Sequence, residues 1–140
     1  MILPNISEFI KEFITKRENS FFEIDLENNQ DKLNDEINGK SVLVIGGAGT
    51  IGTSFIKAIL KFNPTELIVV DTNENGLTEL TRTLRSDFNI RVPDKYLSYP
   101  MSFSSEVFYK MLKNHGPFDI VANFAAHKHV RSEKDTFSIK

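Results

Sequence analysis

The sequence predicts an α/β fold in which a parallel sheet, with strands in the order 3-2-1-4, carries helices on both faces and follows an N-terminal helical extension. Three observations support this prediction. After Gly39, short runs of β-branched and apolar residues alternate with longer amphipathic segments. Breakers that contain proline or glycine separate each helical segment from the next strand. Strands that alternate with helices of this length pair in parallel through right-handed crossovers, which places a ligand at the carboxyl ends of the strands.

Residues 1–39 differ in composition from the rest of the chain, and we interpret them as a separate helical extension. Apolar residues within 6–14 recur at helical spacing, and Asn5 or Ser7 can cap this helix. The stretch 20–38 is polar and acidic with scattered apolar anchors. We therefore expect two short helices that pack on the main domain or on a partner subunit. Their apolar stripe is expected to be a docking face and not a ligand site.

Residues 40–140 are expected to form the main domain, an incomplete nucleotide-binding α/β unit. The patterns predict four strands, at Ser41–Ile45, Glu66–Val70, Lys95–Tyr99 and Ile120–Phe124. They predict three helices between these strands, at Thr50–Phe62, Glu74–Ser86 and Ser104–Asn114. Asn73 and Ser104 are candidate N-caps. A further helix is expected to begin near Glu133.

Composition limits the classes of protein to which the chain can belong. The chain has 140 residues, 40% of them hydrophobic, which suffices for one domain with an apolar core. The formal net charge is -2 and no basic stripe is present, which argues against a nucleic-acid partner. The absence of cysteine excludes disulfides, thiolate metal sites and cysteine nucleophiles. Because no apolar run is long enough to cross a bilayer and no secretion signal is found, we expect a cytoplasmic protein.

A glycine-rich run at 46–52 carries most of the functional information. It follows a strand that reads as buried and opens a helix, and its glycines lie at positions 46, 49 and 52. Glycines let the backbone turn sharply and approach a pyrophosphate, while a helix start offers free N–H groups and the positive end of the dipole. We therefore predict that this run binds a nucleotide cofactor, through Gly46, Gly49, Thr50, Ile51 and Gly52.

An acidic residue, Asp71, closes the next apolar run about 20 residues after the last glycine, as a dinucleotide-binding unit requires. Its carboxylate would accept hydrogen bonds from the ribose hydroxyls of adenosine. A carboxylate there favours NAD over NADP because it would repel a 2′-phosphate, and no arginine follows to neutralise it. The alternative role for Asp71 is as N-cap of the helix that begins near Glu74. Both roles are compatible, because Asn73 can cap that helix instead.

The segment 123–130 follows the fourth predicted strand. Its small residues Ala125 and Ala126 would let the backbone pass close to a cofactor, and Lys128 could contact a phosphate or a ribose. The two histidines of this segment have no third ligand or carboxylate pattern nearby, so no metal site is predicted. Arg131, just beyond it, belongs to a solvated helix start or contacts a phosphate.

Three segments give the chain a family resemblance: the glycine-rich run, the stretch 70–75 and the sequence Phe-Ala-Ala-His-Lys-His-Val at 124–130. On these the chain resembles the extended short-chain dehydrogenase/reductase superfamily. More narrowly it resembles the nucleotide-sugar 4,6-dehydratases of polysaccharide biosynthesis, of the UDP-N-acetylglucosamine 4,6-dehydratase type. The resemblance covers about residues 39–140, and the third segment is the most discriminating part. It implies a Rossmann-type NAD(P)-binding domain, a UDP-sugar substrate and a homo-oligomer.

The resemblance also assigns roles to residues. It implies that the glycine-rich run holds the pyrophosphate, that Asp71 binds the adenosine ribose, and that the loop after the fourth strand lies on the nicotinamide side. The implied cofactor-binding set then includes Asp71, Thr72, Asn73, Ser102, Phe124, Ala125, Ala126 and Lys128. Two positions depart from the family pattern. Ile45 replaces a threonine before the first glycine, and Ser102 is the nearest equivalent of an aspartate that addresses the adenine.

The implied reaction is oxidation of the sugar at C4, loss of water across C5 and C6, and return of the hydride to C6. The catalytic groups of such enzymes include a tyrosine or methionine four residues before a lysine. We expect these groups beyond Lys140 and assign no catalytic residue within the chain. The chain alone is therefore expected to bind NAD weakly and to catalyse nothing. Two alternatives stay open: a nucleotide-sugar 4-epimerase, and a non-catalytic nucleotide-binding or interaction module.

Overall fold

The computed structural model describes residues 21–126, which divide after Asp35 into two compact units. The described part of the first unit consists of helix α2 (Phe21–Asn28) and the start of helix α3 (Gln30–Ile37). This confirms short helices in the acidic stretch. The helices expected within 6–14 and near Glu133 lie outside the described residues, and the domain boundary after residue 39 stays a prediction.

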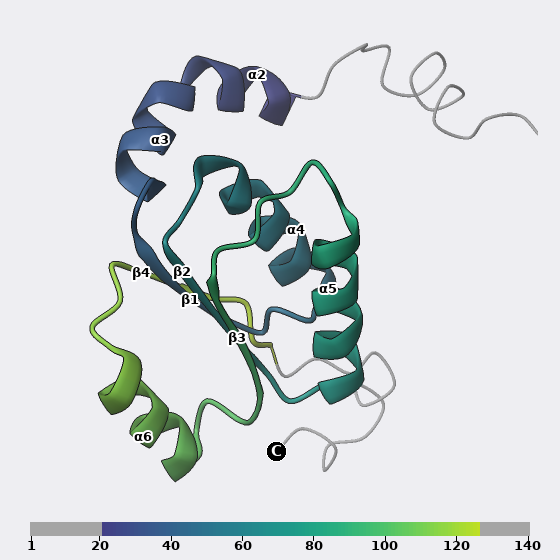
Figure 1. The fold of residues 1–140 in the computed structure, drawn as a ribbon, viewed down its shortest axis with the longest axis vertical. Helices are drawn as coiled ribbons and strands as arrows, with labels where there is room; N and C mark the ends of the chain where they lie inside the picture. Colours follow the sequence, from purple (N-terminus) through teal and green to yellow (C-terminus); the bar gives the residue numbers. More distant parts are fainter. Residues whose placement is uncertain (1–20, 127–140) are drawn as a thin grey trace, which may run out of the picture. The chain divides into compact units, whose positions relative to one another are not determined.

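Four parallel strands form one sheet in the order β3-β2-β1-β4 (Figure 1). Their bounds are β1 (Ser41–Ile45), β2 (Glu66–Asp71), β3 (Lys95–Pro100) and β4 (Ile120–Asn123). The predicted fold class and strand order are therefore confirmed. From β1 the chain continues to β2 and β3 on one side of it, and from β3 it crosses to β4 on the other side of β1, so the strand order reverses between β1 and β4. The carboxyl ends of these two strands form the switch point at which open α/β sheets bind ligands.

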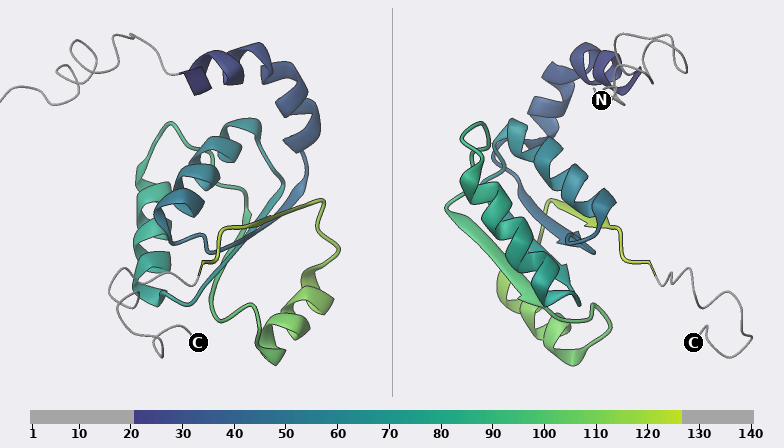
Figure 2. Two further views of the ribbon diagram at one scale, coloured as in Figure 1. Left: turned by 180° about the vertical axis from the view of Figure 1, so that it is seen from behind. Right: turned by 90° about the vertical axis from the view of Figure 1, so that its right-hand side faces the viewer.

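Helices cover both faces of the sheet, as predicted (Figure 2). Helices α4 (Thr50–Ile59) and α5 (Glu74–Ser86) lie on one face, and α6 (Glu106–His115) lies on the other. The helix expected at 50–62 ends earlier, because its last turn is the 3-10 helix η2 (Leu60–Phe62). Asn63 then adopts a left-handed conformation with φ of 52°. The following Pro64 disfavours a right-handed helical conformation at Asn63, and asparagine tolerates the left-handed one.

The core lies on both sides of the central strands. Residues 67–70 of β2 and 42–44 of β1 are almost completely buried. Ile68 and Val70 pack toward Phe108 and Met111 of α6 on one face. Alternate residues face the layer of α4 and α5, so both faces require apolar side chains. This two-sided burial explains why the central strands are unbroken apolar runs.

Side-chain caps fix the starts of two helices. Asn73 caps α5 as predicted, because its side chain accepts a hydrogen bond from the N–H of Gly76 at 3.0 Å. The cap predicted for α6 at Ser104 is wrong. Ser105 accepts the N–H of Phe108 at 3.2 Å, whereas the Ser104 hydroxyl contacts that of Ser102 at 2.9 Å. Helix α6 therefore begins at Glu106, and Phe108 in its first turn packs against the sheet.

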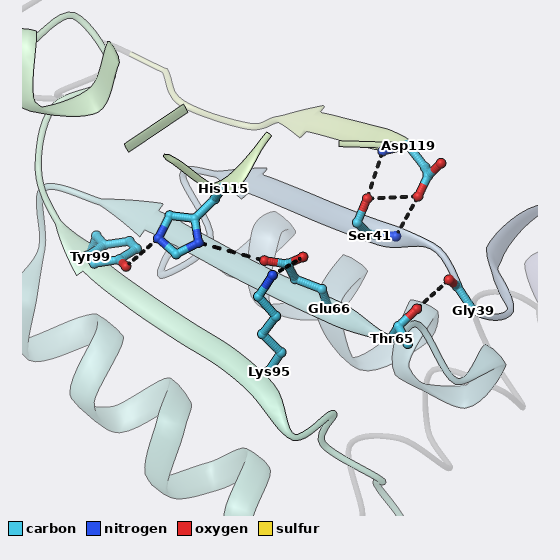
Figure 3. A network of polar contacts seen from close by, with 8 residues as sticks. All are labelled: Gly39, Ser41, Thr65, Glu66, Lys95, Tyr99, His115 and Asp119. Carbon is cyan, nitrogen blue, oxygen red and sulfur yellow. Dashed lines mark hydrogen bonds and ion pairs between the residues drawn. The ribbon is translucent and has the colours of Figure 1, made fainter. Parts of the chain in front are cut away.

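A polar network ties β2, β3 and α6 together (Figure 3). Glu66 is 7% exposed, and its Oε2 lies 2.8 Å from Nζ of Lys95. On its other side, His115 lies with Nδ1 3.9 Å from Oε1 of Glu66 and with Nε2 3.1 Å from the hydroxyl of Tyr99. A buried carboxylate must be paired to be tolerated. The network therefore ties the last turn of α6 to the start of β2.

A second polar contact joins the starts of β1 and β4. Oδ2 of Asp119 accepts hydrogen bonds from the backbone N–H of Ser41 at 2.8 Å and from its hydroxyl at 2.7 Å. The Ser41 hydroxyl also accepts the N–H of Asp119 at 3.0 Å. These bonds, the backbone one first, lower the pKa of Asp119 below its usual value of 3.8. The contact joins residues 78 positions apart and sets the register of β4 on β1.

We expect Asp119→Ala to destabilise the fold at neutral pH and to make its stability less sensitive to acid. The pKa of Asp119 is lower in the folded protein, so its contribution is fully present above the unfolded pKa of about 4 and is lost as pH falls through the folded value. Urea unfolding of both proteins at pH 7 and pH 3 measures the effect. The difference in free energy of unfolding between the two proteins should be smaller at pH 3 than at pH 7. A difference that is the same at both pH values would contradict this assignment.

Candidate functional site

A cavity of about 640 Å³ opens at the carboxyl ends of the strands. The segments that follow all four strands contribute to its wall, together with the last residues of β1 and β2. Its lining residues are Ile45, Gly46, Ala48, Gly49, Val70, Asp71, Thr72, Asn73, Met101, Ser102, Phe103, Ser104, Phe124, Ala125 and Ala126. The cavity is therefore the place where polar groups from distant parts of the sequence meet.

The glycine-rich turn after β1 forms one wall of the cavity. Gly46 has φ of 77°, and its N–H donates to the carbonyl oxygen of Val70 at 2.7 Å. A Cβ at this position would lie 2.6 Å from the backbone nitrogen of Ala125. Position 46 thus requires glycine for two reasons: its backbone is left-handed, and the loop after β4 approaches it closely.

Helix α4 begins at the cavity without a side-chain cap. Its N-cap is Gly49, which supplies no side-chain acceptor. The first N–H groups of a helix have no intrahelical acceptor, so those of Thr50 and Ile51 are left for a ligand or water. A Cβ at Gly49 would meet only the carbonyl oxygen of Gly46, at 3.5 Å, so the space beside this helix start is open. Such a start binds phosphate groups or other anions.

The structure separates two groups within the predicted glycine-run residues. Gly46 and Gly49 line the cavity, whereas Thr50, Ile51 and Gly52 do not. Ile51 is 70% exposed. A Cβ at Gly52 would lie 2.3 Å from the carbonyl oxygen of Gly46, so Gly52 lets α4 pack against the turn. What residues 50–52 offer near this cavity is the set of N–H groups at the uncapped start of α4.

Asp71 lies at the end of β2 and is half-buried. Its Oδ2 accepts the N–H of Ala48, and its Oδ1 accepts the N–H of Asn73, both at 2.9 Å. Asn73 in turn caps α5, so the alternative role of Asp71 as the cap of that helix is not needed. Each carboxylate oxygen has two lone pairs, which leaves one on each oxygen for another donor. A ribose diol presents two such donors.

The segments after β3 and β4 complete the wall. Ser102 lines the cavity, and its role in binding a cofactor stays a prediction; the structure adds Phe103, which is 46% exposed. The sequence pattern did not single out Phe103; the only signal was an apolar residue in the turn that follows a strand. Phe124 donates its N–H to the carbonyl oxygen of Ile45 at 2.8 Å, which holds the second loop beside the turn. Ala125 then donates to the side chain of Asn123 at 3.0 Å.

The cavity thus brings together most of the predicted cofactor-binding residues. Those that line it are Gly46, Gly49, Asp71, Thr72, Asn73, Ser102, Phe124, Ala125 and Ala126. Lys128 lies outside the described residues. The spacing of a tyrosine four residues before a lysine, expected only beyond residue 140, does occur within the chain at Tyr109 and Lys113. Both residues belong to α6 and neither lines the cavity, so the spacing there marks no catalytic pair.

A second cavity, of about 650 Å³, runs along α5 beside the edge strand β3. Arg82 and Arg85 contribute to its wall, and Arg82 is paired with Glu79 at 2.9 Å. The hydroxyls of Thr78 and Ser86 donate to carbonyl oxygens of their own helix. The side chains of Thr78, Arg82 and Ser86 are thus paired within α5. The cavity at the strand ends instead gathers the uncapped start of α4 and Asp71, so we assign the candidate site to that cavity.

Among residues 21–126, which the structure describes, there is neither a metal-binding cluster nor a membrane-spanning helix. No three histidine, aspartate or glutamate side chains there gather closely enough to hold a metal ion. None of the helices in that part of the chain is both long enough and apolar enough to cross a bilayer. The histidines at positions 127 and 129 lie outside this range.

Comparison with known proteins gives one family match. The model of a family described as polysaccharide biosynthesis protein matches residues 42–137. This range includes the glycine-rich turn, Asp71 and the loop after β4. It therefore covers every segment that lines the candidate site.

Curated relatives match parts of the chain. A protein described as an uncharacterized membrane protein, from Methanocaldococcus jannaschii, is 48% identical over 48 residues, which are 34% of this chain and 14% of that protein. The probable polysaccharide biosynthesis protein EpsC of Bacillus subtilis is 28% identical over 103 residues, which are 71% of this chain and 16% of that protein. The chain thus spans about a seventh of the length of these relatives.

Solved structures share the fold. Pen from Bacillus thuringiensis superposes with a TM-score of 0.58 at 25% identity, covering 74% of this chain and 30% of that chain. The enzyme WbmF of Bordetella bronchiseptica, solved in complex with NAD+, superposes with a TM-score of 0.50 at 20% identity, covering 74% of this chain and 28% of that one. These likenesses agree with the parallel sheet and its two helical layers.

The two glycines that line the cavity should differ in their tolerance of alanine. We expect Gly46→Ala to destabilise the protein by at least about 1–2 kcal/mol, because the residue is left-handed and its Cβ would collide with backbone. We expect Gly49→Ala to change stability by less than about 0.5 kcal/mol, because nothing fills the space around it. Urea unfolding of the two variants measures both values. Equal losses would show that the turn is not held as described.

Proposed function

Because the chain belongs to the polysaccharide biosynthesis protein family, we propose that it supplies the nucleotide-binding part of an enzyme that modifies a nucleotide-linked sugar. One observation carries this proposal: the uncapped start of α4 and the carboxylate of Asp71 lie on the same cavity at the switch point of the sheet. A helix start suits a diphosphate, and a carboxylate with free lone pairs suits a ribose diol. A dinucleotide contains both groups in adjacent positions.

The residues of the cavity fit NAD as the cofactor. The N–H groups at the start of α4 would hold the diphosphate, and Asp71 would hold the adenosine ribose. The cavity wall at Ser102 and Phe103 would contact the adenine. The wall at Phe124 to Ala126, together with Lys128, would contact the nicotinamide. None of the described lining residues is an arginine or a lysine. A 2′-phosphate would therefore lie beside the carboxylate without a counter-charge, which favours NAD over NADP.

The proposed reaction is the 4,6-dehydration of a UDP-linked hexose such as UDP-N-acetylglucosamine. When bound, NAD supplies hydride acceptance from C4 of the sugar and hydride return to C6, with water lost across C5 and C6 between the two steps. The residues of this chain bind and orient the cofactor in this proposal, and none of them is assigned to the proton transfers. The chain is proposed to act in the cytoplasm and within a homo-oligomer.

We expect the chain to bind NAD at least tenfold more tightly than NADP, since the unscreened carboxylate of Asp71 would repel a 2′-phosphate. Isothermal titration calorimetry with each nucleotide measures the ratio. Gly49→Ala tests the site itself. It should weaken the binding of NAD while changing the free energy of unfolding by less than about 0.5 kcal/mol. Equal affinities for both nucleotides, or undiminished binding by the glycine variant, would contradict the assigned geometry.

We also expect the 140-residue chain to form no 4-keto sugar from UDP-N-acetylglucosamine in the presence of NAD, because its site residues are assigned to cofactor binding alone. Mass spectrometry of the sugar nucleotide detects the loss of one water. A dehydrated product would overturn the assignment of catalysis to residues outside this chain. A product isomeric with the substrate would instead favour 4-epimerisation, which involves no loss of mass.

A further inference from the structure

We propose that Asp71 is a positioning residue for the glycine-rich turn as well as a ligand for the ribose. The geometry of the phosphate-binding turn would then depend on a side chain of the neighbouring strand. This inference rests on the nucleotide-binding function proposed above. It goes beyond that function because it assigns the carboxylate a role that exists before any nucleotide is bound.

Two elements hold Ala48 at the apex of the turn. Oδ2 of Asp71, at the end of β2, accepts the N–H of Ala48 at 2.9 Å in a partly buried environment. Gly76, in the first turn of α5, lies so close that a Cβ on it would be 2.9 Å from the Cβ of Ala48. The apex is therefore fixed from two directions by residues that follow it by 23 and 28 positions.

The turn needs such a contact because glycine makes it flexible. Three of the four residues at 46–49 are glycines, and glycine has the largest conformational freedom of any residue. The first two residues of the turn are held by the bond from the Gly46 N–H to the carbonyl oxygen of Val70, at 2.7 Å, and by the Thr53 hydroxyl, which donates to the Gly47 carbonyl oxygen at 3.1 Å. The Asp71 bond restrains the part between these anchors and the start of α4.

The same contact determines which N–H groups can receive a diphosphate. The N–H of Ala48 already donates to Asp71 and is therefore not available to the diphosphate. The diphosphate is therefore directed to the N–H groups at the start of α4. If Asp71 were absent, the Ala48 N–H would be free and the turn could present it to the ligand in other orientations.

Positioning the turn and binding the ribose are compatible roles. Oδ1 and Oδ2 of Asp71 each accept one backbone N–H, from Asn73 and Ala48 respectively. Each oxygen keeps a second lone pair, and the two together match the two hydroxyls of a ribose. One side chain thus connects the ribose site with the phosphate site.

The variant Asp71→Asn tests the proposal, since one of the two carboxylate oxygens becomes an NH2 group that cannot accept an N–H, so the bonds to Ala48 and Asn73 cannot both be kept. Two probes separate the roles: ADP, and 2′,3′-dideoxy-ADP, which retains the diphosphate and lacks the ribose hydroxyls. We expect the variant to bind both probes more weakly, with a loss of about tenfold for the dideoxy compound, as for a lost hydrogen bond to a charged group. A residue that only bound the ribose would leave the affinity for the dideoxy compound unchanged.

Asp119→Ala is the matched control. It removes the contact between Asp119 and Ser41 at the starts of β1 and β4, away from the cavity lining, and destabilises the fold without touching the turn. Its affinity for 2′,3′-dideoxy-ADP should equal that of the unmodified chain. If this control loses affinity to the same extent as Asp71→Asn, the loss reflects general stability and the proposal is overturned.

Amide hydrogen exchange at Ala48, followed by NMR without any nucleotide, gives a second readout. We expect slow exchange in the unmodified chain and in Asp119→Ala, and exchange at least tenfold faster in Asp71→Asn. Unchanged exchange would overturn the positioning role. If the unmodified chain binds neither ADP nor NAD, the proposed function fails, and the exchange at Ala48 still decides whether Asp71 holds the turn.

Discussion

The close approach of Gly46 to the backbone of Phe124 and Ala125 is the constraint on which the site depends. It requires a residue without a Cβ, since such an atom would lie 2.6 Å from the nitrogen of Ala125. It also requires β1 and β4 to be parallel neighbours, so that the segments after both strands leave the sheet at the same edge. Where they separate, helix α4 begins and a cavity opens. Fold and site are thus connected through one backbone contact.

The two edges of the sheet have different tasks. At the amino edge, polar groups pair with one another: Glu66 with Lys95, Asp119 with Ser41, and the hydroxyl of Thr65 with the carbonyl oxygen of Gly39 (Figure 3). At the carboxyl edge, the start of α4 keeps N–H groups without a side-chain cap. Groups at this second edge therefore stay available for a ligand. Proteins commonly accept such local costs where they bind.

Patterns with strong periodicity predicted the architecture well, whereas local choices were harder. The four strands and their order follow from apolar runs that must be buried on both faces. The cap of α6 was misplaced because two adjacent serines are equivalent in sequence, and only the packing of Phe108 distinguishes them. The early end of α4 depends on the geometry before Pro64. Phe103 was missed because an exposed apolar residue has no meaning until the cavity beside it is known.

The sequence by itself determined the α/β class, the glycine turn, and the acidic residue at the end of the second strand, because each follows from local spacing and backbone chemistry. Only the tertiary structure decided what these parts do to one another. It separated the lining residue Gly49 from Gly52, which packs α4 against the turn. It also placed Asp71 on the N–H of Ala48, a residue 23 positions away. Such contacts depend on how parallel strands align their ends, which no local pattern encodes.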